Sequence, residues 1–230
     1  MVFKKWGDEM MDIWEAMSSR HSVRSYLNRP LETEKVSELQ NTVDGINAET
    51  GFHFVLCLDE PEAFQANKPH YGSFNGCRNY FALIAPKGED ERVGYYGERL
   101  VLLAQQLGLN TCWVAVSYKK GKVTAPVYTG EKIHALVALG YGKTQGVPHK
   151  SKNVSKLAKM TIDTPKWFET GMDAVMLAPT AINQQRFWFE QIGERGVKAK
   201  ALLGPCSKVD LGIVKYHFEL GAGKENFDWV

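Results

Sequence analysis

Ala178-Pro179-Thr180-Ala181-Ile182-Asn183-Gln184-Gln185-Arg186-Phe187 marks the end of one predicted element and the start of another. The apolar helical run from Trp167 must end here, because Pro179 lacks an N–H and disfavours helical geometry in the residue before it. Alternating bulky residues then predict a strand over 186–192. Residues 178–185, termed the elbow, leave short side chains, backbone groups and the amides of Asn183 and Gln185 available to a planar polar ligand.

Apolar periodicity predicts the other elements on both sides of the elbow. Upstream, we expect helices over residues 10–19, 32–48 and 94–107, and strands over 52–59, 80–85, 110–116 and 133–139. Residues 60–76 are polar and rich in turn formers, which indicates an irregular excursion. Downstream, we expect a short strand over 200–203 and a helix over 209–220. The loop 140–152 forms an internal boundary, after which the order helix, strand, helix recurs in shorter form.

The composition is that of an ordinary soluble globular protein, with 44% hydrophobic and 23% charged residues in a chain of 230. The formal net charge of +2 is too small to indicate a nucleic-acid-binding face. No apolar run approaches the ~20 residues of a membrane-spanning helix, and the first nine residues are not followed by the apolar core of a signal peptide. The sequence therefore favours a cytoplasmic protein of one large or two small domains, without a nucleic-acid or membrane partner.

Several motifs of other protein classes are incomplete. Gly140-Tyr141-Gly142 follows a predicted strand, as a dinucleotide fingerprint does, but Pro148 interrupts the place where its helix should open. Gly142-Lys143-Thr144 resembles the end of a phosphate loop, yet Val137 stands where that loop needs its first glycine. The histidines form no chelating cluster, the four cysteines form no C-x-x-C pair, and no G-x-S-x-G motif occurs, so neither a metal site nor a serine hydrolase is indicated. We expect buried, reduced thiols at Cys57 and Cys112.

Two basic groups are candidates for anion binding. Arg20 and Arg24 flank Ser22 just beyond a predicted helix, and a guanidinium can hold phosphate oxygens in a bidentate fork. Lys150 and Lys152 lie in the loop after a predicted strand. On these segments alone, solvated side chains are the simpler interpretation, and anion binding stays open.

Three motifs together resemble the FMN-dependent nitroreductase family. Arg20-His21-Ser22-Val23-Arg24 followed by Tyr26, termed the arginine segment, looks like the family's N-terminal flavin-binding segment. The elbow looks like the family's A-P-S-S-x-N-x-Q motif, and residues 94–108 running into 110–116 are similar to its central helix and following strand. The resemblance implies an α+β, nitroreductase-like fold with a central, mainly antiparallel sheet flanked by helices.

The order of these motifs departs from the usual family pattern, in which the elbow soon follows the arginine segment. The matching place, residues 43–51, lacks an elbow, and Asp210-Leu211-Gly212-Ile213-Val214 after the actual elbow is similar to the start of a central helix. Ordinary members are homodimers in which one subunit gives the arginine segment and its partner the elbow to each FMN. We therefore expect a pseudo-dimer with an internal pseudo-twofold repeat: a full half over 1–152 and a reduced half over 153–230, together one compact unit with one FMN site. It would act as a monomer or assemble as a homodimer.

The resemblance implies flavin contacts from the first half. Arg20 should meet the FMN phosphate with help from Lys150 and Lys152, while Ser22 adds a hydroxyl and His21 belongs to the same segment. Arg24 should face the flavin pyrimidine edge, where a cation stabilises the negative charge of reduced flavin. The backbone of Ala115 and Val116 is assigned to the flavin N5 region, although the family usually has acidic and glycine residues there.

The second half is expected to supply the elbow. Pro179, Thr180, Ala181 and Asn183 should pack on and hydrogen-bond the ring system, with Gln185 supporting the elbow. Asn75 and Arg78 keep a spacing similar to flavin-contacting residues in some members, and are equally consistent with a loop surface. Further pocket walls are expected from Tyr71, Phe74 and the loop around Tyr118.

The implied activity is that of an NAD(P)H-dependent FMN oxidoreductase. It would pass hydride from the nicotinamide through FMN to an electron-poor acceptor, such as a nitroaromatic or a quinone, by a ping-pong mechanism. No catalytic acid or base is then required, since the cofactor carries the chemistry. Two other classes remain open: a flavin-binding protein without significant turnover, and a small α+β interaction domain without flavin.

Overall fold

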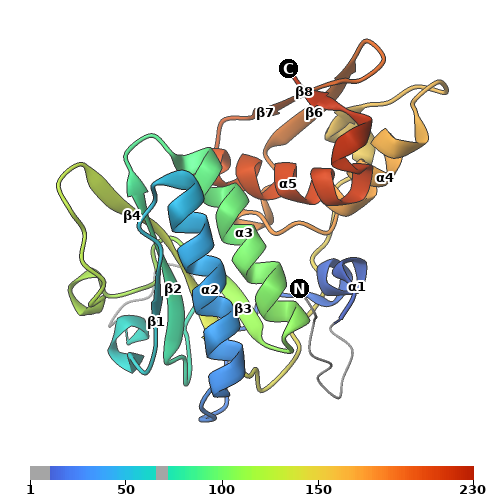
Figure 1. Ribbon diagram of the computed structural model, residues 1–230. Helices are drawn as coiled ribbons and strands as arrows, with labels where there is room; N and C mark the ends of the chain where they lie inside the picture. The colour runs from blue at the N-terminus through green and yellow to red at the C-terminus, as the bar shows by residue number, and fades with distance from the viewer. Residues whose placement is uncertain (1–10, 66–71) are drawn as a thin grey trace, which may run out of the picture.

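The computed structural model describes residues 11–65 and 72–230, arranged as two four-stranded sheets with helices around them (Figure 1). The first sheet has the order β1-β2-β4-β3 and is antiparallel throughout. Its strands are β1 (Val55–Cys57), β2 (Asn79–Pro86), β3 (Asn110–Val114) and β4 (Glu131–Gly140). The α+β class and the mainly antiparallel sheet expected from the sequence are confirmed.

The helices of the first part cover one face of this sheet. In Figure 1, α2 (Thr33–Thr50) and α3 (Asp90–Gln106) run side by side in front of the strands, while the short α1 (Ile13–Ser19) packs against the C-terminal part of α3. Strand β2 is buried along nearly its whole length, and its side chains alternate between two cores. Phe81 and Leu83 join the core under α2 and α3, whereas Tyr80 and Ala82 join a second core on the opposite face. This accounts for the continuous apolar run of residues 80–85.

The second sheet is smaller and mixed. It has the order β5-β6-β7-β8, with parallel pairs at both edges and an antiparallel pair in the middle. Its elements are β5 (Ala158–Lys159), α4 (Lys166–Val175), β6 (Phe187–Ile192), β7 (Gly196–Ala201), α5 (Ser207–Ala222) and β8 (Asp228–Trp229). An aromatic core, which includes Phe168, Phe189 and Phe218, fills the space between this sheet and helices α4 and α5.

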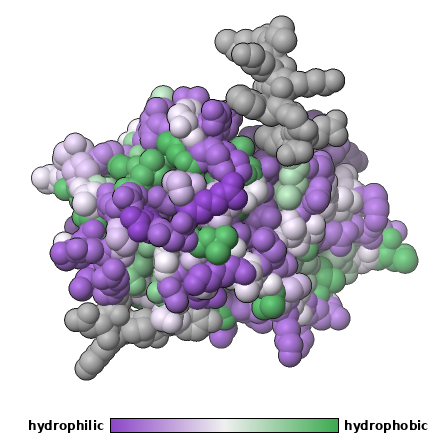
Figure 2. Space-filling model, turned by 90° about the horizontal axis from the view of Figure 1, so that it is seen from below, coloured by the Kyte–Doolittle hydropathy of each residue, from purple (hydrophilic) through white to green (hydrophobic). Residues whose placement is uncertain are grey.

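Short 3-10 turns and surface loops complete the chain. The turns are η1 (Pro61–Phe64), η2 (Lys120–Lys122), η3 (Val154–Lys156), η4 (Ala181–Asn183) and η5 (Lys224–Asn226). On the face shown in Figure 2, the surface is mostly hydrophilic with small hydrophobic areas between. Within the described ranges, no helix is both long and apolar enough to cross a membrane.

Helix α5 of the second part packs directly on α3 of the first. A Cβ atom added to Gly94 on α3 would lie 2.0 Å from the carbonyl oxygen of Val209, and one added to Gly212 on α5 would lie 1.8 Å from that of Glu91. Both positions therefore need glycine because the two backbones touch, and not because of an unusual φ angle.

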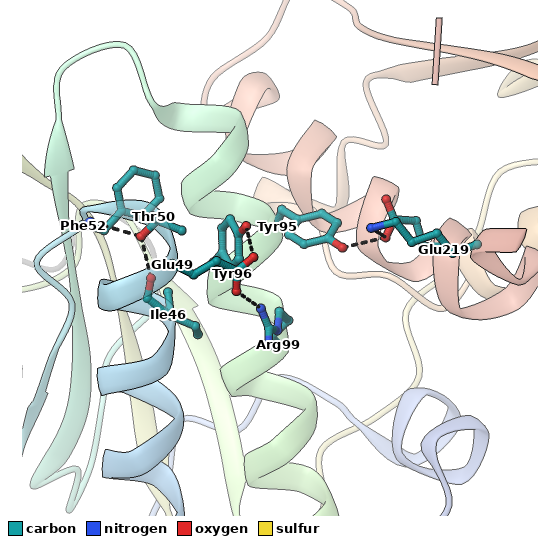
Figure 3. A network of polar contacts seen from close by, with 9 residues as sticks. Ile46, Glu49, Thr50, Phe52, Tyr95, Tyr96, Arg99 and Glu219 are labelled. Atoms are coloured by element: carbon teal, nitrogen blue, oxygen red, sulfur yellow. Dashed lines mark hydrogen bonds and ion pairs between the residues drawn. The ribbon is translucent and has the colours of Figure 1, made fainter. Parts of the chain in front are cut away.

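Tyrosines on α3 fix its neighbours on both sides. Figure 3 shows Tyr96 directed toward α2 and Tyr95 directed toward α5. The Tyr96 hydroxyl donates to Glu49 at 2.6 Å, and Arg99 donates to the same carboxylate at 3.1 Å. The Tyr95 hydroxyl donates to Glu219 at 2.6 Å. Helix α3 is thus the element through which both parts are joined.

Three elements differ most clearly from the bounds predicted for them. Helix α3 begins at Asp90, four residues before its expected start, since Gly94 lies inside it as a packing residue. The expected strand 52–59 shrinks to β1, because the Asn47 side chain of α2 binds both backbone groups of Phe54. The strand expected at 200–203 is β7, which begins at Gly196 after a tight turn from β6. Residue 10 of the first predicted helix, like the expected pocket residue Tyr71, lies outside the described residues.

Candidate functional site

A mostly apolar cavity of about 200 Å³ lies where the two parts of the chain meet. From the first part, the arginine segment gives Ser22 and Arg24, and the end of β3 and its loop give Trp113, Ala115 and Val116. The elbow gives Pro179, Thr180, Ala181 and Ile182, and the start of α5 gives Cys206 and Asp210. Phe74 lines the same cavity. Seven of the site residues expected from the sequence therefore surround one space, although they are spread over 160 positions of the chain.

The arginine segment is held beside β3 by backbone pairing. Ser22 forms a parallel bridge with Thr111, and the N–H of Val23 donates to the Thr111 carbonyl at 3.0 Å. On its other side, the Asn75 N–H donates to the Arg24 carbonyl at 2.9 Å. Asn75 thus positions Arg24 through its backbone. Arg78 points elsewhere and pairs with Asp59 and Asn28.

The elbow is built from residues in the left-handed region of backbone space. Ile182, Asn183 and Gln185 have φ values of 48°, 55° and 46°. Asn tolerates this conformation, whereas the β-branched Ile182 does so at a cost in free energy. The turn is held by Asp210 on α5, whose carboxylate accepts from the Ala181 N–H at 2.9 Å and from the Gln184 amide at 2.7 Å. Burial raises the pKa of Asp210 to about 6, although these two donors oppose the shift.

Lys150 and Lys152 lie behind the elbow and do not line the cavity. The Lys150 carbonyl accepts from the side-chain amides of Asn183 at 2.8 Å and Gln185 at 3.0 Å. The Lys152 N–H donates to the Gln185 amide oxygen at 2.8 Å, and the Lys152 ammonium donates to the Gln185 carbonyl at 3.1 Å. Asn183 and Gln185 therefore fasten the 150–152 loop to the elbow, so that Asn183 contacts the loop where the sequence had suggested a ring contact.

Arg20 lies in a buried polar cluster beside the cavity. Its side chain is 4% exposed, and its buried Nε atom, 3.9 Å from Glu98 Oε1, has no hydrogen-bond partner among the described residues. The Glu98 carboxylate also accepts from the Trp113 indole at 2.8 Å and lies 3.0 Å from His217 Nε2. We term Arg20, Glu98, Trp113 and His217 the buried carboxylate cluster. Burial lowers the pKa of Arg20, and the charge of Glu98 opposes that change.

Two histidines lie close to Arg20. Burial, followed by the positive charge of Arg20, lowers the pKa of both His21 and His149. His149 directly precedes Lys150, so the loop fastened to the elbow also reaches the arginine segment. In the parts of the chain that are described, no group of three His, Cys, Asp or Glu side chains is placed to hold a metal ion.

Sequence reasoning missed three of the residues that shape this site. Asp210, Glu98 and His217 each lie within an amphipathic helical pattern, and each binds a group distant in the sequence. A polar residue on an apolar helical stripe is a weak signal, and His217 in the run 209–220 carries it most clearly. Cys57 and Cys112 are buried, as expected.

Comparison with solved structures places this arrangement in the nitroreductase fold. A "putative nitroreductase" from Thermotoga maritima matches with a TM-score of 0.66 and 22% identity over 96% of this chain and 88% of its own. A protein from Bacteroides thetaiotaomicron described as "Putative NADH dehydrogenase/NAD(P)H nitroreductase" matches with a TM-score of 0.51 and 18% identity over 63% of this chain and 95% of its own. A nitroreductase family protein from Streptococcus pneumoniae has the same TM-score at 13% identity, over 65% of this chain and all of its own.

Family membership follows from the sequence. The family model described as "Putative TM nitroreductase" matches residues 12–222, which is most of the chain. The chain therefore belongs to this nitroreductase family, and the expected resemblance is confirmed. No curated protein matches the sequence. An oxidoreductase role is the function that family and fold together support.

Proposed function

We propose that the protein is an FMN-dependent oxidoreductase that holds one FMN in the cavity between the arginine segment and the elbow. One observation carries the proposal: two sequence motifs that resemble flavin-binding segments, far apart in the chain, line the same cavity. The lining is mainly apolar, with a few polar groups at its edge, as in sites for planar organic cofactors. A cavity of about 200 Å³ fits part of such a cofactor, and the remainder would extend along the arginine segment.

The charged residues fit the two polar ends of FMN. The Nε donor of Arg20 is buried, and no acceptor from the described residues lies within hydrogen-bond distance of it, which is costly unless an anion comes close enough to accept from it. A phosphate at the Arg20 side of the cavity would provide that anion, with the Ser22 hydroxyl, His21 and the 149–152 loop nearby. Arg24 lines the cavity itself, where its cation would stabilise negative charge on the pyrimidine edge.

The elbow fits the flat face of a ring. Pro179, Thr180 and Ala181 present short side chains to the cavity, and the Ala181 N–H is already bound by the Asp210 carboxylate. The Ala115 and Val116 backbone, which follows β3, also lines the cavity, and Trp113 is fixed by its bond to Glu98. Bound FMN would supply hydride transfer from NAD(P)H to an electron-poor acceptor in two separate half-reactions. The side chains would orient the cofactor and need not exchange protons with it.

Reciprocal contacts between α3 and α5 support the pseudo-dimer that we propose. Gly94 on α3 contacts Val209 on α5, and Gly212 on α5 contacts Glu91 on α3. Each glycine lies about one turn from the residue that the other glycine contacts, as across a twofold axis. A strand also follows each helix along the chain, β3 after α3 and β8 after α5 and the turn η5. The arginine segment has no counterpart in the second part, which supports one FMN per chain.

A purification with an absorbance spectrum tests this function. We expect one FMN per chain after denaturation, bleached by NADH or NADPH and reoxidised by a nitroaromatic or a quinone. Flavin that keeps its colour with excess nicotinamide would instead identify a flavin-binding protein without turnover. Colourless protein that takes up no added FMN would overturn the proposal, and two FMN per chain would overturn the single-site arrangement.

A further inference from the structure

We infer that Glu98 is a positioning residue for the proposed cofactor site: it holds Arg20 for the phosphate end and Trp113 for the ring end. This inference rests on the proposed function. Glu98 is completely buried on α3, yet it contacts groups from three other places in the fold: Arg20 after α1, Trp113 on β3 and His217 on α5. Burying a carboxylate is costly unless neighbouring groups compensate its charge. The partners of Glu98 therefore indicate its role.

The two oxygens of Glu98 have different partners. Oε2 accepts the indole N–H of Trp113 at 2.8 Å, and Trp113 lines the cavity. Oε1 lies 3.0 Å from His217 Nε2 and 3.9 Å from Arg20 Nε. The contact with Arg20 is an ion pair without a hydrogen bond, which restrains the guanidinium but leaves its Nε donor unused. One carboxylate therefore restrains a wall of the cavity and the cation beside it.

His217 holds this carboxylate in place. Its Nδ1 atom lies 3.0 Å from the Ala174 carbonyl, which only accepts hydrogen bonds. Nδ1 must therefore carry a proton, and Nε2 then either donates a second proton to ionised Glu98 or accepts one from neutral Glu98. Ala174 belongs to α4, the helix that ends just before the elbow. The cluster thus connects the arginine segment of the first part with the helix that leads into the elbow.

The substitution Glu98→Gln tests whether Glu98 positions Arg20 through its charge or only fills space in the core. A glutamine keeps the size, accepts from Trp113 with its amide oxygen and donates to a neutral His217 with its amide nitrogen. The ion pair with Arg20 is lost, and so is the charge on the carboxylate that a protonated His217 would face. Glu219→Gln is the matched control, because Glu219 also lies between α3 and α5 and accepts a tryptophan indole, that of Trp229 at 2.8 Å, without contacting Arg20.

The experiment compares the affinities of the full chain for FMN and for riboflavin, which lacks the phosphate. In the wild type, Arg20 should make FMN the preferred ligand. We expect Glu98→Gln to reduce that preference roughly tenfold, the size of one charge-assisted hydrogen bond, with FMN binding weakened more than riboflavin binding. Glu219→Gln should leave the preference unchanged even if it lowers the melting temperature.

The outcomes separate this inference from the proposed function. Wild-type protein that binds neither flavin overturns the proposed function and this inference with it. Wild-type protein that prefers FMN, together with a Glu98→Gln variant that keeps the same preference, overturns the inference alone. Equal weakening of both ligands identifies a merely structural role and also overturns it. Should Glu98→Gln not fold, His217→Gln, which loosens the same carboxylate, should reduce the preference in the same direction, and an unchanged preference there decides against it.

Discussion

The contact between α3 and α5 has a buried side and an open side. Each side contains a glutamate that accepts a hydrogen bond from a tryptophan, but the two glutamates have different roles. On the buried side, Glu98 accepts from Trp113 and faces Arg20 and His217. On the open side, Glu219 accepts from Trp229 and Tyr95 and lies 3.7 Å from Lys224, in a groove exposed to solvent. A carboxylate with a tryptophan partner thus serves the cavity in one place and joins helices in the other. The two carboxylates differ in two respects: Glu98 is more deeply buried than Glu219, and only Glu98 faces Arg20.

The largest loss of stability should come from disrupting the close contact between α3 and α5, which both sides share. Gly212→Ala would bring a Cβ to 1.8 Å from the Glu91 backbone, so the helices must separate. We expect a loss of about 3 kcal/mol or more in the free energy of unfolding, measured by urea denaturation. Gly45→Ala on α2, where nothing lies within 4 Å, is the control and should be neutral or stabilising by about 0.5–1 kcal/mol. Similar stabilities of the two variants would contradict the crossing.

Asp210 is a second buried carboxylate, and it sharpens the comparison because its hydrogen-bond partners are amide N–H groups and not a cation. Its pKa of about 6 in the folded protein exceeds the ordinary 3.8, so the folded state binds its proton more tightly. Stability should therefore fall as the pH rises from about 4 to 6, by about 2–3 kcal/mol from this group.

Asp210→Asn cannot titrate and should lack this fall. Urea unfolding of the wild type and this variant between pH 4 and 7 measures the difference. Parallel pH profiles for the two proteins would show that Asp210 is not the titrating group.

Removing the cation of the buried side tests the proposed phosphate contact directly. Arg20→Ala should weaken FMN binding by roughly tenfold to a hundredfold, since hydrogen bonds to charged groups contribute about 1.5–3 kcal/mol. Riboflavin binding should change much less. Lys152→Ala, behind the elbow, should have a smaller effect because its ammonium binds the Gln185 carbonyl. Fluorescence titration measures both affinities, and equal FMN affinity of Arg20→Ala and the wild type would contradict the assignment.

The smallest effect is expected on the open side. Tyr95→Phe removes the hydroxyl that donates to Glu219 at 2.6 Å. We expect a loss of about 1 kcal/mol in the free energy of unfolding and no change in flavin affinity. Thermal denaturation and flavin titration of the same preparation check both parts. An altered flavin affinity would show that the two sides are coupled.

The sequence was sufficient to locate the segments of the candidate site that local chemistry marks. Pro179 ends a helix by its own covalent structure, and Ser22 with Arg24 forms a recognisable motif, so these segments could be found and they do line one cavity. The roles of Asn183 and Lys150 could not be found in this way, because their mutual hydrogen bond joins two loops. The role of Glu98 could not be predicted either, because it depends on contact with Arg20, which is distant in the sequence.

The same distinction holds for the fold. The continuous apolar run of β2 marks a buried strand by itself. The start of α3 was misplaced because the role of Gly94 depends on Val209 of another helix. Local pattern therefore predicts elements, whereas contacts between elements decide their ends.

The close crossing of α3 and α5 also bears on how the chain can be divided. A fragment ending at the loop 140–152 would lack His217 and leave Glu98 without that partner, and it would expose the surface of α3 that α5 covers. A buried carboxylate without its partners is strongly destabilising. The two parts should therefore unfold in a single cooperative transition, and neither should be obtained as a stable fragment. The molecule, although built around two sheets, is therefore expected to be indivisible.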